Sequence, residues 1–140
     1  MKKIMVFGTF DIFHYGHLQL LKQAKKLGDH LTVVIARDEN VIKIKKIKPY
    51  HTEKERMEIM ESLKMIDSAI LGDKKDVYKV IKQEKPDVIA LGYDQNVFVD
   101  KLENYLKKEK INSIIVRLKP YKEKRLKSRL IKISGNNIQN

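Results

Sequence analysis

The chain has 140 residues, no cysteine, and 30 Lys and Arg against 18 Asp and Glu, for a net charge of +12. This length fits one domain with a substantial core, and the absence of cysteine excludes disulfides and thiolate metal sites and favours a cytoplasmic protein. No apolar run approaches the roughly 20 residues that span a bilayer, so we expect neither a membrane span nor a signal peptide. The charge favours a polyanionic partner, but a lysine-rich surface without a binding role explains it equally well.

Apolar runs alternate with helix-period segments along the chain. The runs predict five strands, near Ile4–Phe7, Leu31–Ala36, Ser68–Leu71, Val88–Leu91 and Ser113–Val116. The segments between and after them predict helices near Gly16–Leu27, Glu53–Leu63, Asp76–Gln83, Val97–Lys108 and Lys127–Ile133. This alternation predicts an α/β fold, a Rossmann-like, doubly wound, five-stranded parallel sheet with helices on both faces. We expect a single domain over residues 1–134 and a polar tail over 135–140.

The segment GTFDIFHYGH, residues 8–17, lies between the first strand and the first helix. A helix N-terminus presents unpaired N–H groups and a partial positive charge, which favour phosphate. Gly8 and Gly16 carry no Cβ, so a ligand can approach the backbone there. His14 and His17 lie three residues apart on the first turn, so they should converge on one point and donate hydrogen bonds to an anion. The alternative is a structural glycine turn with two surface histidines.

This segment resembles the signature of the cytidylyltransferase-like nucleotidyltransferases, in which G-T-F-D precedes an H-x-G-H motif, here His14-Tyr15-Gly16-His17. The resemblance implies that a phosphate of an acceptor attacks the α-phosphorus of a nucleoside triphosphate and displaces pyrophosphate. A phosphate nucleophile is already ionised at pH 7, so catalysis needs alignment and charge neutralisation rather than a general base. The resemblance also implies Mg²⁺ or another divalent cation, held mainly by nucleotide phosphates rather than by protein ligands.

Further candidate residues follow the other strands, because ligands of parallel sheets bind outside the strands' carboxyl ends. The resemblance implies catalytic roles for His14, His17 and one lysine of a basic loop over residues 43–48, with Lys43 first and Lys46 next; a solvated lysine run is the alternative. Arg56 is expected either to meet a phosphate or to pair with a carboxylate. The expected nucleotide-binding residues are Gly8, Thr9, Phe10, His14, Tyr15, Gly16, His17, Asp94, Tyr121, Ser128 and Arg129, with Gly92 and Arg117 as further candidates.

Two of these expectations concern the later part of the chain. Asp94, in a G-x-D sequence after the fourth strand, is implied to meet the ribose or base, although Gly and Asp also favour an ordinary turn. Relatives carry a Ser/Thr-rich turn before the last helix, and here only Ser128 and Arg129 keep its chemistry. Asp11 is expected to be structural, as a hydrogen-bond acceptor for the loop backbone.

Three acceptors fit the resemblance. Archaeal-type FAD synthetases also resemble this chain in Ala36–Glu39, Lys48-Pro49 and Leu91–Gln95, so we expect FMN adenylyltransferase activity with ATP and FMN as substrates. The alternatives are glycerol-3-phosphate cytidylyltransferase, which uses CTP, and phosphopantetheine adenylyltransferase, which carries a T-x-H motif instead. A non-catalytic, basic nucleic-acid-binding domain is the alternative of another class; the intact H-x-G-H argues against it, so we expect no nucleic-acid partner. Small enzymes of this superfamily are often dimers, so we expect a homodimer.

Overall fold

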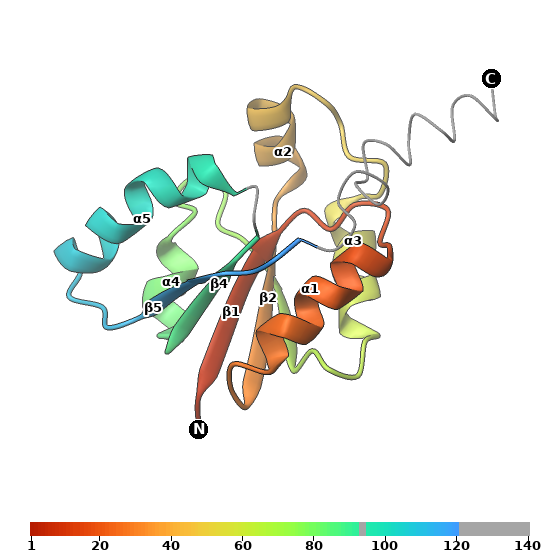
Figure 1. Ribbon diagram of the computed structural model, residues 1–140. Helices are drawn as coiled ribbons and strands as arrows, with labels where there is room; N and C mark the ends of the chain where they lie inside the picture. Colours follow the sequence, from red (N-terminus) through yellow and green to blue (C-terminus); the bar gives the residue numbers. More distant parts are fainter. Residues whose placement is uncertain (93–94, 121–140) are drawn as a thin grey trace, which may run out of the picture.

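The structure, a computed structural model, describes residues 1–92 and 95–120, and gives the backbone alone for 96–100. Five strands form one parallel sheet in the order β3-β2-β1-β4-β5 (Figure 1). The strands are β1 (Lys3–Gly8), β2 (His30–Ile35), β3 (Ser68–Leu71), β4 (Val88–Leu91) and β5 (Ile114–Arg117). The helices of the described residues are α1 (Tyr15–Lys25), α2 (Asp38–Lys45), α3 (Glu53–Glu61), α4 (Lys79–Glu84) and α5 (Asn96–Lys108).

The predicted α/β fold with a parallel sheet is confirmed, and each predicted strand is present within about one residue. The alternation of side chains along β1 shows why the sheet needs helices on both faces. Ile4 and Val6 pack in one cluster with residues of α1 and α3. Met5 and Phe7 pack in a second cluster with residues of α4 and α5. Each face therefore has its own apolar core.

The predicted basic loop over residues 43–48 is wrong for 43–45, because residues 38–45 form helix α2, while 46–48 lie outside any helix or strand. The N-terminus of α2 is stabilised by a residue distant in sequence: the Glu53 Oε1 atom accepts the Asp38 N–H at 2.9 Å. In return, Asp38 Oδ2 accepts the Glu53 N–H at the start of α3, at 3.1 Å. A helix whose N-terminus depends on this tertiary contact gives a weak local signal. The predicted helix over 127–133 and the tail over 135–140 lie outside the described residues.

The order of the strands reverses at β1, which marks the position of a site. The chain passes from β1 outward through β2 to β3, and then returns to the other side of β1 with β4 and β5 (Figure 1). In such sheets, ligands bind at this switch point, outside the carboxyl ends of the strands. The segment that contains Gly8, His14, Gly16 and His17 leaves β1 at this point.

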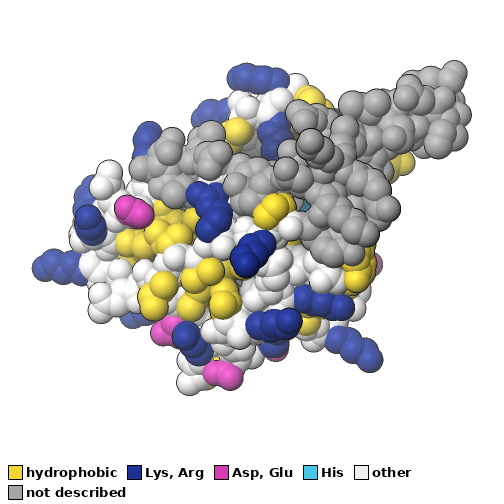
Figure 2. Space-filling model, viewed as in Figure 1, with side chains coloured by type: hydrophobic (Ala, Val, Ile, Leu, Met, Phe, Trp, Pro, Cys, Tyr) yellow, Lys and Arg dark blue, Asp and Glu magenta, His cyan; other side chains and the backbone are white. Residues whose placement is uncertain are grey.

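Lysine and arginine side chains are spread over the face seen in Figure 2 rather than gathered in one patch. In the described part of the chain, no helix is both long and apolar enough to cross a bilayer.

Candidate active site

The loop after β1 is tightly folded around Phe10. A Cβ atom added at Gly8 would lie 2.5 Å from the Phe10 ring, so glycine is required there by the packing of this ring. Gly8 was expected to make room for a ligand, whereas in the structure its missing Cβ makes room for the Phe10 ring. Phe10 and Ile12 both adopt the left-handed region, with φ of 51° and 49°, which is costly for a β-branched residue such as Ile12.

Asp11 holds this loop in place, as expected. Its two carboxylate oxygens accept the backbone N–H groups of Tyr50, at 2.7 Å, and His51, at 3.0 Å. The loop after β1 is thus attached to the segment that precedes α3. The carboxylate of Asp11 is engaged in structure rather than directed to chemistry.

His14 and His17 form a capping box at the start of α1. His14 is the N-cap residue, and its Nδ1 atom accepts the Gly16 N–H at 3.0 Å. The Nδ1 atom of His17 accepts the His14 N–H at 3.3 Å, and the two rings are stacked with centroids 3.8 Å apart. Because each Nδ1 is an acceptor, each neutral imidazole carries its proton on Nε2 and presents an Nε2–H donor.

The spacing of the two histidines predicted that they converge, and they do. Their capping role was missed, although its signal is present in the sequence. The pair occupies the N-cap and N3 positions, which Ser and Glu occupy in the common capping box. The same contacts therefore stabilise the helix and fix both tautomers.

Both histidines are held neutral. Burial lowers the pKa of His14 below its usual value. The pKa of His17 is lowered to about 3, first by burial, then by the neighbouring His14 and by the charge of Lys45. The Nε2 atom of His14 is buried and has no hydrogen-bond partner among the described residues. A buried donor without a partner is costly, and an oxygen of a bound anion would supply the acceptor.

Helix α2 brings a lysine to this pair, but not the expected one. Val41 is buried, and Lys45, one helical turn later, lies on the same side of α2. The Lys45 Nζ atom lies 3.5 Å from the Thr9 hydroxyl. Lys43, Lys45 and Lys46 are all exposed, but Lys43 lies on the other side of the helix from Lys45, and Lys46 ends the helix with φ of 62°. The predicted basic loop included Lys45 but ranked Lys43 and Lys46 ahead of it, because no helix was expected there; helical spacing from Val41 favours Lys45.

Arg56 connects three segments behind the site. It is fully buried and donates to Thr9 O at 2.9 Å, to His51 O at 3.2 Å and to Asp38 Oδ1 at 2.6 Å. Of its two expected roles, the structure shows the pair with a carboxylate. Arg56 thereby fixes the position of α2, and hence of Lys45, relative to the loop after β1.

On the other side of the switch point, Gly92 and Arg117 are in contact. The Arg117 NH1 atom donates to the Gly92 carbonyl at 2.8 Å.

The remaining expected nucleotide-binding residues are placed as follows. Tyr15, the first residue of α1, is half exposed. Four expected nucleotide-binding residues lie outside the described residues: Asp94, Tyr121, Ser128 and Arg129.

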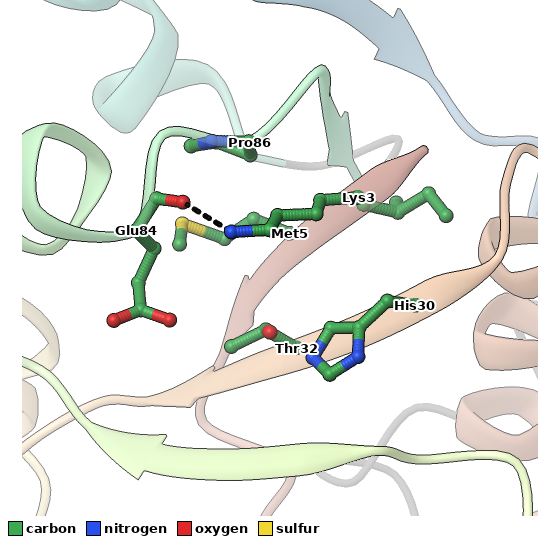
Figure 3. A pocket seen from close by; sticks show the side chains of 7 residues that line it. Lys3, Met5, His30, Thr32, Glu84 and Pro86 are labelled. Atoms are coloured by element: carbon green, nitrogen blue, oxygen red, sulfur yellow. Dashed lines mark hydrogen bonds between the residues drawn. The ribbon is translucent and has the colours of Figure 1, made fainter. Parts of the chain in front are cut away.

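A pocket also lies at the opposite end of the sheet, at the amino ends of the strands. It is lined by residues at the amino ends of β1 and β2 and by the segment before β4, including Lys3, His30, Thr32 and Glu84 (Figure 3). The Lys3 Nζ atom donates to the Glu84 carbonyl there at 3.4 Å. Within residues 1–92 and 95–120, no three His, Asp or Glu side chains gather closely enough to hold a metal ion.

The arrangement matches a known family. Residues 5–138 fit the family model described as cytidylyltransferase-like. The chain belongs to the cytidylyltransferase-like family. A solved structure of this shape is the lipopolysaccharide core biosynthesis protein from Thermoplasma volcanium, with a TM-score of 0.81 and 41% identity over 86% of this chain and 98% of that one. Pantoate-beta-alanine ligase from Francisella tularensis, with a TM-score of 0.59 and 19% identity, shares the fold alone.

Within this family, curated relatives carry a more specific name. The FAD synthase of Ferroglobus placidus is 49% identical over 119 residues, which cover 85% of this chain and 77% of that protein. The FAD synthase of Archaeoglobus profundus is 47% identical over 123 residues, which cover 88% and 78%. The similarity to both proteins thus extends over most of the chain.

Proposed function

We propose that this chain is an FMN adenylyltransferase, which joins AMP from ATP to FMN and gives FAD and pyrophosphate. The observation that carries the proposal is the histidine pair, whose two Nε2–H donors stand at the N-terminus of α1 beside the switch point. The choice of FMN as acceptor is supported by the relatives named FAD synthase, at 43% to 49% identity.

In this reaction, an FMN phosphate oxygen forms a bond to the α-phosphorus of ATP. The bond from the α-phosphorus to the bridging oxygen breaks, and pyrophosphate leaves with the electron pair. No proton has to be removed from the nucleophile, so the site must align two polyanions and neutralise growing charge. The N-terminus of α1, the donors of His14 and His17, and the ammonium of Lys45 are suited to this task.

The histidines suit this role because they remain neutral. A cationic imidazole would lose its charge-dependent contact whenever it lost a proton, whereas His17, with a pKa of about 3, keeps one Nε2–H donor through the neutral range. We propose that these donors contact phosphate oxygens whose charge increases in the transition state. Lys43 and Lys46, exposed near the end of α2, would attract the triphosphate from farther away.

A divalent cation would add charge neutralisation at the phosphates. The donor set fits a cation held mainly by phosphates and water, because both oxygens of Asp11 already accept backbone N–H groups. We further propose that Asp94 meets the ribose or base, and that Tyr121, Ser128 and Arg129 contribute to nucleotide binding, as their match to the family's motifs suggests.

The test is an assay of pyrophosphate release and FAD formation with purified protein. We expect both products from ATP with FMN, and much less pyrophosphate from CTP with glycerol-3-phosphate. A preference for CTP with glycerol-3-phosphate would refute FMN as the acceptor, but the chain would still be a nucleotidyltransferase. Absence of pyrophosphate with either pair, together with binding to nucleic acid, would favour the non-catalytic alternative.

A further inference from the structure

The hydrogen-bond ladder between β1 and β4 ends earlier than its neighbours. Pairing of β1 with β2 continues to Gly8 and Ile35, and pairing of β4 with β5 continues to Leu91 and Arg117. Pairing of β1 with β4 stops at Val6 and Ala90, before the end of either strand. The interruption falls at the switch point, and the backbone groups beyond it need other partners.

The groups that the next rung would join are the Phe7 carbonyl and the Gly92 N–H. The Gly8 carbonyl accepts a hydrogen bond from the β2 side, so the preceding carbonyl, of Phe7, faces β4. The Leu91 carbonyl accepts one from the β5 side, so the N–H of the next residue, Gly92, faces β1. The two groups therefore point into the same gap.

The side-chain amide of Gln95 fills this gap. Its Oε1 atom accepts the Gly92 N–H at 2.7 Å, and its Nε2 atom donates to the Phe7 carbonyl at 2.9 Å. A primary amide offers one acceptor and donors, as a peptide group does, so both backbone groups are satisfied although the strands do not meet. The Gly92 carbonyl is held too, by the Gln95 N–H at 3.2 Å and by Arg117 at 2.8 Å.

We propose that the Gln95 amide is a spacer that keeps the carboxyl ends of β1 and β4 apart, and that nucleotide binding at the switch point requires this spacing. The inference rests on the proposed function. Gln95 is a positioning residue, because its described contacts are with backbone atoms alone. Without the amide, Phe7 O and Gly92 N–H can bond to each other directly. Removing Gln95 should then cost little stability but much nucleotide affinity.

The chain contains a matched control for the loss of such an amide. Gln23 makes the same pair of bonds with one backbone segment: its Nε2 atom donates to Lys119 O at 2.9 Å, and its Oε1 atom accepts the Lys119 N–H at 3.0 Å. Gln23 lies on α1 and bonds the segment after β5, so its amide bridges neither β1 nor β4. Comparing variants of the two glutamines separates the effect of where the amide lies from the effect of losing its two hydrogen bonds.

The experiment measures the affinity of α,β-methylene-ATP by calorimetry, together with Tm, for the wild type, Gln95→Ala, Gln95→Glu and Gln23→Ala. We expect Gln95→Ala to weaken binding about tenfold or more while its Tm falls no further than that of Gln23→Ala. Gln23→Ala should bind within about twofold of the wild type. Gln95→Glu should also weaken binding, because its carboxylate faces the Phe7 carbonyl. In Gln95→Ala, the Gly92 N–H should remain protected from hydrogen exchange, now by Phe7.

Three results would overturn the inference. One is wild-type affinity in Gln95→Ala, and another is a freely exchanging Gly92 N–H in that variant. The third is a loss of affinity that Gln23→Ala shares in equal measure. Wild-type protein that binds the analogue but makes no FAD would refute the FMN proposal and leave the inference in place. Wild-type protein that binds no nucleotide would overturn both.

Discussion

At the amino ends of the strands, here called the amino edge of the sheet, an aspartate stands directly before each of three strands. Each accepts a backbone N–H from a neighbouring strand or from the residue just before it. These aspartates are Asp29, Asp67 and Asp87, and their partners are the N–H groups of Lys2, Leu31 and Lys3, each at 2.8 Å. The carboxyl edge also uses side chains to cap backbone groups, but it leaves the Nε2 donor of His14 buried without a described partner.

The difference separates stability from function. The aspartates of the amino edge satisfy backbone donors, and Asp67 pairs with Lys25 as well, so these side chains serve the structure. The carboxyl edge contains the left-handed Phe10 and Ile12 and the neutral, stacked histidines, arrangements that cost free energy in the empty protein. We interpret this cost as pre-organisation for an anion, which a ligand offsets when it binds.

Replacing His14 should have the largest effect, and on activity alone. Asn is a good N-cap residue, so His14→Asn keeps the cap but removes the Nε2–H donor. We expect turnover to fall by about 10²–10³-fold, the usual cost of one donor to a developing oxyanion. The variant should unfold within a few degrees of the wild type in a calorimetric scan.

The matched control is His30→Asn, at the amino edge. His30 lines the pocket in Figure 3 and has no part in the proposed chemistry. Turnover of this variant should stay within about twofold of the wild type. Near-normal turnover of His14→Asn, or an equal loss in His30→Asn, would remove the distinction between the two edges.

Two lysines of α2 test how finely the carboxyl edge is organised. Lys45 lies beside Thr9 and adds to burial in lowering the pKa of His17, whereas Lys43, two residues earlier, lies on the other side of the helix. Lys45→Met should lower kcat about tenfold or more, because the Lys45 ammonium would neutralise the negative charge that grows on pyrophosphate as it leaves. Lys43→Met should change kcat less than about threefold. Steady-state kinetics in which Lys43→Met is the worse enzyme would restore the lysine that the sequence first suggested.

The histidines should make the carboxyl edge sensitive to acid. The pKa of His17 is about 3 in the folded protein and near 6.5 in the unfolded chain. Between these values the unfolded chain binds a proton that the folded protein does not. The stabilising contribution of neutral His17 is therefore complete above pH 6.5 and is lost as the pH falls toward 3, by up to about 1.4 kcal/mol per pH unit.

Urea unfolding of the wild type and His17→Asn at pH 7, 5.5 and 4 measures this contribution. The free energy of unfolding should fall more steeply with acid in the wild type, because Asn does not titrate. Parallel pH profiles would mean that His17 is as easily protonated in the folded protein as in the unfolded chain.

Removing an aspartate of the amino edge should have the smallest effect, and on stability alone. Asp67 accepts hydrogen bonds from Lys25 Nζ at 2.7 Å and from the Leu31 N–H, and these lower its pKa. Its contribution should be present above pH about 4 and be lost as the pH falls through its lowered pKa. Asp67→Ala should lower the free energy of unfolding by about 1 kcal/mol at pH 7. A loss of turnover without a loss of stability would contradict this assignment.

The sequence was sufficient where local patterns determine structure. The apolar runs of β1 to β5 and the spacing of His14 and His17 were enough to predict the sheet and the convergence of the rings. Helix α2 was missed because its N-terminus depends on Glu53, 15 residues after Asp38 in the chain. With α2 went Lys45. The Gln95 amide contacts Phe7, 88 positions earlier in the chain, and no local pattern indicates such a contact.

The central claim is that nucleotide binds at the carboxyl edge of β1 and β4. Backbone amide chemical shifts, followed by NMR while α,β-methylene-ATP is added, test it most directly. We predict the largest changes at Gly8, Gly16 and Gly92, with little change at Lys3 and Leu31. Changes centred on Lys3, Leu31 and the pocket of Figure 3, with none at the three glycines, would contradict the account.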